Sequence, residues 1–258
     1  MREGRATLKA GWLALAAVAA LAVGCSTRGK PAVAAASRDI STRYNMARIY
    51  LEQGRPQDSI RLLKQVLDQV PRHDGARNLL GLVHWSTGRL EQARAEFERA
   101  LEINPYLSDA RVNLGVVLSE QGDYTRADAE FRRTLEDKTY PTPEKPLVNL
   151  ALNQMKQGKP REALARAGEA IRTNPRHVRA YEVYVQALRT AGAAGAGTEY
   201  QTLQRDMDRS LDFHLNLAEA FVREKDNARA RAHLQRVVAL EPDSEQATRA
   251  RQSLEKIH

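Results

Sequence analysis

The 258-residue sequence contains one cysteine, Cys25, and few aromatic residues, which make up 5% of the chain. A single cysteine excludes any disulfide within the chain. Leu, Ala, Glu, Arg and Gln dominate the composition, which favours helices over sheets. The length is sufficient to bury a core in one or two domains.

The sequence also lacks the motifs that carry catalysis or metal binding. None of its six histidines forms an HExxH pair or lies at metal-ligand spacing from the cysteine. It contains no GxSxG elbow, phosphate-binding loop or glycine-rich dinucleotide fingerprint. We therefore expect no enzyme, cofactor, metal site or small-molecule substrate.

The net charge of +8 is compatible with nucleic acid, an anionic membrane surface or a solvated arginine-rich face. Arginine is spread along the chain rather than concentrated in one run, and the N-terminus argues against a nucleic-acid compartment. The sequence therefore favours a solvated basic face and no nucleic-acid partner.

Residues 1–24 have the features of a targeting segment. Basic residues among the first nine precede an apolar run at 11–23, which is shorter than the about 20 residues of a comfortable membrane span. The run ends in LAVGC, which resembles the lipobox of bacterial lipoproteins. The alternative is an ordinary signal peptide or an anchor helix with an incidental cysteine.

The lipobox resemblance implies that Cys25 becomes the first residue of the mature chain, acylated on its sulfur and its amine. Ser26 follows, whereas in double-membraned bacteria an aspartate there tends to retain lipoproteins in the inner membrane. The resemblance therefore implies an outer-membrane lipoprotein that faces the periplasm. Small and polar residues predict that residues 25–37 form the lipidated cysteine and a flexible tether, which lead to a domain at 38–258.

The stretch 74–105 shows how this domain is organised. It combines a Leu-Gly pair at 80–81, a turn glycine at 88, an Ala-x3-Phe-x2-Ala stripe at 93–100 and a closing proline. This pattern resembles the tetratricopeptide repeat, in which two helices form a hairpin. Gly81 and Ala93 leave room where the helices cross, and Phe97 fills the space beside them.

One such hairpin cannot bury its own apolar faces, so copies must stack on one another. The predicted fold is all-α: a tetratricopeptide-repeat superhelix, or solenoid, of about six helix-turn-helix repeats and roughly thirteen antiparallel helices. A polar helix at 244–257 suits a C-terminal cap. The repeats are expected at 40–73, 74–107, 108–141, 144–177, 178–210 and 211–244.

The fifth repeat is degenerate because AGAAGAG at 191–197 replaces its turn. Each glycine costs about 1 kcal/mol in a helix, so we expect a loosened turn or a longer loop there. Such a loop would let the last third of a single domain hinge.

In tetratricopeptide repeats, set positions of each first helix line a groove, and the resemblance transfers these positions to this chain. The first four repeats present an apolar strip there, which is typical of a partner site unless neighbouring helices bury it. Asparagine amides on the strip can hold a peptide backbone, although asparagine is also a consensus choice of the repeat. The strip fits an extended or helical peptide. The predicted partner-binding residues are Tyr44, Leu51, Asn78, Leu82, Trp85, Val112, Val116, Asn149, Leu152 and Met155.

A lipobox, a short tether and repeats together resemble the pilotins of type IV pili, the Tgl, PilF and PilW group. The likeness is strongest at Tyr140-Pro141 and Asn149-Leu150, because in that family a Tyr-Pro also ends the third repeat. The resemblance implies binding of secretin subunits, which form the outer-membrane pore of the pilus, and assembly of that pore for pilus biogenesis and motility. The alternative is a general periplasmic scaffold lipoprotein for cell-wall or outer-membrane protein assembly.

Overall fold

The computed structural model describes the backbone of residues 30–257 and the side chains of residues 38–192 and 196–257. Thirteen α-helices and no strand occur within residues 30–257, which confirms the predicted all-α class. The helices are α1 (Lys30–Glu52), α2 (Pro56–Gln69), α3 (Asp74–Ser86), α4 (Leu90–Ile103), α5 (Ser108–Glu120), α6 (Tyr124–Glu136), α7 (Glu144–Lys156), α8 (Pro160–Thr173), α9 (Val178–Ala191), α10 (Ala193–Met207), α11 (Leu211–Arg223), α12 (Asn227–Leu240) and α13 (Glu245–Lys256).

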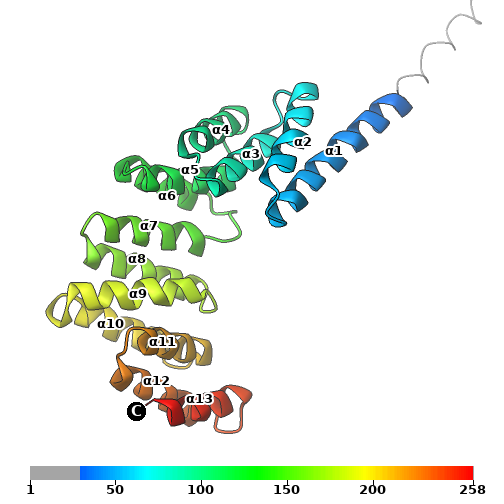
Figure 1. The fold of residues 1–258 in the computed structure, drawn as a ribbon. Coiled ribbons are helices and arrows are strands. Elements are labelled where there is room, and N and C mark those ends of the chain that lie inside the picture. The colour runs from blue at the N-terminus through cyan, green and yellow to red at the C-terminus, as the bar shows by residue number, and fades with distance from the viewer. Residues whose placement is uncertain (1–29, 258) are drawn as a thin grey trace, which may run out of the picture. The chain divides into compact units, whose positions relative to one another are not determined.

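The helices belong to two compact units, which we describe separately. The first unit ends at Arg72 and contains α1 and α2, which pack against each other. The second begins at His73 and contains α3 to α13. Within it, α3–α4, α5–α6, α7–α8 and α11–α12 form hairpins, and consecutive hairpins lie side by side (Figure 1). This is the stacked arrangement that the repeats predict.

The first helix of every hairpin ends near a residue in the left-handed conformation. Glycine occupies this place five times, with φ between 69° and 85°. Because glycine has no Cβ, it adopts this conformation without the steric cost that other residues bear. In the last hairpin, Lys225 takes the same place with φ 61°. The repeat therefore keeps its turn geometry even where the sequence offers no glycine.

The expected close crossing of the two helices is confirmed. Ala93 and Phe97 are fully buried, and a Cβ added to Gly81 would lie 2.5 Å from Phe97 Cε1. The next repeat has the same contact, since a Cβ on Gly115 would lie 2.6 Å from Phe131 Cε1. Only glycine lets the two helices approach this closely around an aromatic ring.

The prediction of a loop at 191–197 was wrong. α9 continues to Ala191, Gly192 makes the turn alone with φ 72°, and α10 begins at the next residue. Alanine has the highest helix propensity, and Ala196 and Leu203 are buried to 0% and 1% exposure. Burial of this face offsets the cost of the glycines, so the segment is helical.

The structure also corrects part of the predicted tether. α1 begins at Lys30, so residues 30–37 are helical, while residues 25–29 lie outside the described part. Pro31 suits the first turn of a helix and the alanines that follow are strong helix formers. No helix within residues 30–257 combines the length and apolar character that a membrane span needs.

Candidate partner-binding surfaces

The second unit places most of the predicted strip on its first helices, α3, α5 and α7. Trp85 is the most accessible of these apolar residues, with 38% of its surface exposed. Leu82, Val116, Leu152 and Met155 are half-buried. The strip is therefore neither fully covered nor fully open, and its role in binding remains a prediction.

Val112 does not belong to an accessible strip. Its side chain is only 7% exposed and packs in the core formed by repeats two and three. The repeat pattern places Val112 on the groove, but in this chain its side chain packs between neighbouring helices. We therefore correct its assignment from partner-binding residue to core residue.

Polar groups on the strip bond to one another. The Asn113 amide donates to Asn78 Oδ1 at 3.1 Å, and Trp85 Nε1 donates to Glu120 Oε2 at 2.9 Å. Both bonds join α3 to α5, so they align adjacent first helices. Asn149 lies half-buried on α7. At Asn78 and Asn113 the amides therefore serve the stacking of repeats, which was the structural alternative for this position.

In the first unit, Tyr44 and Leu51 are half-buried on α1. Met46 and Ile49 are more accessible, with 41% and 43% of their surfaces exposed. The predicted strip did not include this pair, although both residues are exposed on the same helix. Cys25, the predicted site of lipid attachment, lies outside the described residues.

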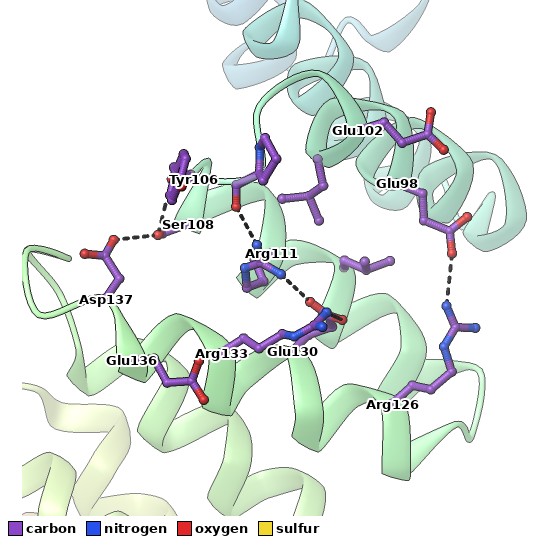
Figure 2. A pocket seen from close by; sticks show the side chains of 13 residues that line it. Glu98, Glu102, Tyr106, Ser108, Arg111, Arg126, Glu130, Arg133, Glu136 and Asp137 are labelled. Atoms are coloured by element: carbon purple, nitrogen blue, oxygen red, sulfur yellow. Dashed lines mark hydrogen bonds and ion pairs between the residues drawn. The ribbon is translucent and has the colours of Figure 1, made fainter.

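A broad hollow of about 880 Å³ lies between α4, the start of α5 and α6, and none of the predicted strip residues lines it (Figure 2). We call it the α4–α6 hollow. Its lining is mostly charged and comes from repeats two and three. The lining residues are Glu98, Leu101, Glu102, Pro105, Tyr106, Ser108, Arg111, Leu114, Arg126, Glu130, Arg133, Glu136 and Asp137.

An ion-pair triad forms part of the hollow's wall. Glu130 on α6 accepts hydrogen bonds from Arg111 Nη1 at 3.0 Å and from Arg133 Nη1 at 3.3 Å. The preceding repeat holds the equivalent triad, in which Glu96 bonds to Arg77 at 2.9 Å and Arg99 at 2.5 Å. The carboxylate therefore links the first helix of each of these repeats to its second helix.

Glu96 overturns one expectation. The alternation of Glu96 and Glu98 with arginines predicts a solvated helix face. Glu98 fits that prediction, but Glu96 is only 7% exposed. Its burial is stable because Arg77, from another helix, and Arg99 both neutralise it.

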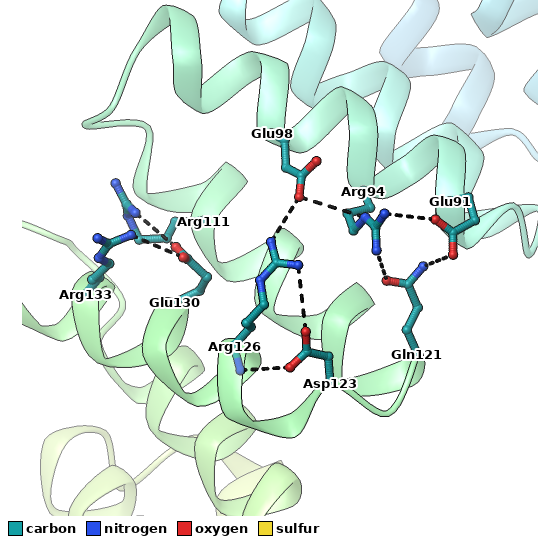
Figure 3. A network of polar contacts seen from close by, with 9 residues as sticks. All are labelled: Glu91, Arg94, Glu98, Arg111, Gln121, Asp123, Arg126, Glu130 and Arg133. Carbon is teal, nitrogen blue, oxygen red and sulfur yellow. Dashed lines mark hydrogen bonds and ion pairs between the residues drawn. The ribbon is translucent and has the colours of Figure 1, made fainter.

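A second polar network holds α4 to the next hairpin (Figure 3). Glu98 pairs with Arg94 at 3.8 Å and with Arg126 of α6 at 3.2 Å. Gln121, which follows α5, donates to Glu91 at 2.8 Å and accepts from Arg94 at 3.5 Å. These contacts fix the second helices of repeats two and three and occupy the guanidinium group of Arg126.

The rim of the hollow carries Tyr106, whose surface is 90% exposed. Its backbone is held in place: its N–H donates to Asn104 Oδ1 at 3.1 Å, and its carbonyl accepts from the Ser108 N–H at 2.8 Å. Ser108 Oγ donates to Asp137 Oδ2 at 2.9 Å. Hydrogen bonds from the Thr139 and Ser108 side chains lower the pKa of Asp137, so this carboxylate is held ionised.

Sequence reasoning missed Tyr106, Glu102 and Glu136 as candidate site residues. The available signal was Tyr106 itself, because an aromatic residue directly after the closing Pro105 has no core position to fill. Glu102 and Glu136 carry no comparable signal, since solvated glutamates are common on second helices.

Tyr140, part of the Tyr-Pro junction, has a structural role. Its side chain is 8% exposed and its hydroxyl donates to Asp109 Oδ1 at 2.9 Å. Burial is the main cause that raises the pKa of Tyr140 to about 12. The hydroxyl therefore stays protonated and ties the end of the third repeat to the start of its first helix.

No group of three histidine, cysteine, aspartate or glutamate side chains within the described residues is arranged to hold a metal ion. The hollow and the strip instead offer charged, aromatic and apolar contacts on rigid helices. Such surfaces suit recognition of another protein.

Comparison with solved structures shows the same fold in other proteins. PilF of Pseudomonas aeruginosa matches with a TM-score of 0.59 and 18% identity, covering 84% of this chain and 98% of that chain. PilW, described as a widely conserved type IV pilus biogenesis factor, matches with 0.58 and 19%, covering 84% and 97%. A structure of the MamA protein also matches, with a TM-score of 0.55 and 16% identity, covering 69% of this chain and 96% of that chain.

Comparison of the sequence with family models agrees with the structure, whereas no curated protein matches the chain. Models of the tetratricopeptide repeat match residues 44–108 and 148–201, residues 84–139 and residues 212–244. The matches cover hairpins in both compact units. The chain therefore belongs to the tetratricopeptide-repeat family, whose members typically act as scaffolds for protein interactions.

Proposed function

We propose that this protein is an outer-membrane pilotin lipoprotein, which binds secretin subunits and promotes their assembly for type IV pilus biogenesis and motility. The observation that carries the proposal is the shared fold with PilF and PilW over nearly the whole length of both. The lipobox-like LAVGC at 21–25 supports it independently, because the sequence predicts the anchor and the fold predicts the binding domain.

The anchor defines the first step of the proposed mechanism. Acyl chains on Cys25 insert into the inner leaflet of the outer membrane, and each buried methylene contributes about 0.8 kcal/mol. More than one chain makes the attachment lasting. Bound secretin subunits are then confined to the membrane surface, which raises their effective concentration for ring assembly.

The strip on α3, α5 and α7 supplies the proposed secretin contact. Trp85 offers the largest exposed apolar surface there, and Leu152 and Met155 continue the strip on α7. Half-buried side chains on fixed helices lose little conformational freedom when a partner binds. An amphipathic helix or an extended segment with apolar side chains fits this surface.

The alternative is a general periplasmic scaffold lipoprotein for cell-wall or outer-membrane protein assembly. The match to MamA supports this alternative, because MamA has the same fold and is not described as a pilus protein. The two functions share the anchor and the strip but differ in the proteins that bind.

The deciding experiment is a pull-down of the acylated full chain from an envelope extract, read by mass spectrometry. A Trp85→Ala, Leu152→Ala variant tests the strip. Alanine is preferable to glutamate at residue 85, because the Trp85 indole lies against Glu120 and a second carboxylate there would add repulsion. We expect the native chain to recover a secretin and the variant to recover at least about tenfold less, the loss typical of an aromatic anchor.

The matched control is Val178→Ala, Val222→Ala, which truncates two exposed apolar residues outside the predicted strip. This control should recover as much secretin as the native chain. Recovery of wall synthases or barrel-assembly components in place of a secretin would refute the pilotin function and support the scaffold. Equal recovery by the strip variant, with its helical content unchanged, would place the contact elsewhere.

A further inference from the structure

We infer that the α4–α6 hollow is a second docking surface, which takes a lysine- or arginine-bearing segment of a partner protein. It lies on α4, the start of α5 and α6, whereas the accessible residues of the strip lie further along α3, α5 and α7. The inference therefore does not rest on the pilotin function and holds for any partner of this chemistry.

The first observation is the state of the charges in the hollow. All three of its guanidinium groups are already paired, Arg126 with Glu98, and Arg111 and Arg133 with Glu130. These ion pairs leave little positive charge for a ligand.

Three carboxylates in the hollow, those of Glu102, Glu136 and Asp137, have no such partner, although Asp137 accepts hydrogen bonds from the Ser108 and Thr139 hydroxyls. Glu102 on α4 and Glu136 on α6 form no ion pair with any described side chain, and they lie on different walls (Figure 2). The hollow therefore offers uncompensated negative charge from two sides, which favours a cation between them.

The second, independent observation is Tyr106 on the rim. An aromatic ring with 90% of its surface exposed gains nothing from the core of the protein. Its backbone bonds to Asn104 and Ser108 hold the loop that carries the ring at the rim of the hollow. The face of a tyrosine ring attracts guanidinium and ammonium groups, and arginine most often.

The third observation is that the hollow is preformed. Its volume of about 880 Å³ is large enough for several side chains of a partner segment. The ion pairs Glu98–Arg126 and Glu130–Arg111 hold its walls from three helices (Figure 3). A partner would not have to order this surface on binding.

The overall charge of the protein makes the inference easy to test. The chain carries a net charge of +8, so long-range electrostatics repel a basic peptide. Attraction must then come from a local site. A fluorescein-labelled peptide of alternating glycine and arginine, titrated with the full chain in a non-ionic detergent, reports binding through fluorescence anisotropy.

We expect the arginine peptide to bind and its glutamate counterpart not to bind. The Glu102→Gln, Glu136→Gln variant should weaken binding about tenfold. Adding Tyr106→Ala to it should weaken binding by about another fivefold. The matched control is Glu162→Gln, Glu241→Gln, which removes two exposed glutamates outside the hollow. It should change binding less than about twofold, since isolated surface charges contribute little.

The outcomes separate the two sites. The Trp85→Ala, Leu152→Ala strip variant should still bind the arginine peptide, whatever it does to secretin recovery. Equal weakening by the hollow variant and its control would overturn the inference, because binding would then follow total charge. Preference for the glutamate peptide, or binding that depends on the strip, would overturn it as well. Circular dichroism checks that each variant keeps its helices.

Discussion

In the sixth repeat, hydrogen bonds determine which nitrogen of each of two buried histidine rings carries a proton. His214 Nδ1 and His233 Nδ1 lie 2.8 Å apart, and His214 Nε2 lies 2.9 Å from the carbonyl oxygen of Asp208. A carbonyl only accepts, so His214 Nε2 must carry a proton and its Nδ1 must accept from His233. His233 Nε2 then accepts from the Tyr200 hydroxyl at 2.8 Å. Because burial favours the neutral form of both rings, this chain of bonds assigns one tautomer to each of them.

Burial lowers the pKa of both rings. The pKa of His233 falls to about 3, mainly because of burial and to a smaller extent because of the neighbouring His214. In the unfolded chain both residues bind protons below about pH 6.5, whereas the folded chain resists protonation. The stability that comes from neutral rings is therefore complete above pH 6.5 and is lost as the pH falls towards 3.

We predict that the unfolding temperature, followed by circular dichroism, is lower at about pH 5 than at about pH 7. His233 alone would account for a loss of up to about 2 kcal/mol at pH 5, at 1.36 kcal/mol per pKa unit. A His214→Gln, His233→Gln variant should show a shallower decline over the same range. An identical decline would mean that other groups cause the pH dependence.

At the scale of helices, α10 shows how packing outweighs local preference. Its sequence contains two glycines, yet it forms a helix that packs on α8 and α9. Gly197 faces open space, because an added Cβ would meet no atom within 4 Å. Gly81 on α3 is the opposite case, since Phe97 occupies the space that a Cβ would need.

We predict opposite effects for two identical substitutions, measured by urea unfolding. Gly197→Ala should stabilise the protein by about 1 kcal/mol, because alanine is the better helix former and nothing obstructs its methyl group. Gly81→Ala should destabilise it by about 1–3 kcal/mol, since the cost of overpacking against Phe97 exceeds the gain in propensity. A stabilising Gly81→Ala would contradict the close crossing, and a neutral Gly197→Ala would contradict the helix at 193–207.

At the scale of the whole molecule, stability resides in contacts between neighbouring repeats. Both large clusters of buried apolar residues lie within the second unit, one in repeats two and three with Leu150 of repeat four, and one in repeats four to six. Repeat proteins behave approximately as a sum of repeat and neighbour-interface terms. The second unit therefore has a core of its own.

We predict that a fragment of residues 73–258 folds without the first unit. It should keep its helical circular dichroism and a cooperative thermal transition, because both apolar clusters remain complete. A fragment that starts at Leu90 is the control: it removes α3 and with it the Gly81 contact of Phe97, so its unfolding temperature should be lower. A fragment 73–258 without a cooperative transition would contradict the independence of the second unit.

The repeats could be placed from sequence because their signals are local. A Leu-Gly pair, a turn glycine and a phenylalanine at fixed spacing describe one hairpin, and each hairpin repeats the same geometry. The positions of Gly81 and Phe97 were predicted for this reason. The helix at 193–207 was not, because the burial of Ala196 and Leu203 depends on where α8 and α9 lie.

The candidate sites depend still more on tertiary structure. The strip could be outlined from repeat positions, yet Val112 on it is buried and the Asn78 amide bonds to Asn113. The α4–α6 hollow could not be predicted from the sequence, because Glu102 and Glu136 come from helices of different repeats and only the packing of those helices brings them to one surface.

The sequence by itself determined the helical class, the repeat spacing and the positions of most turns, since these follow from propensity and periodicity within about 34 residues. Only the tertiary structure decided which charges are buried, which are paired and which remain available. Glu96 and Glu98 are two residues apart in the same helix, yet one is buried between two arginines and the other faces solvent. Their difference arises from side chains supplied by neighbouring helices, and the stacking of hairpins sets that proximity.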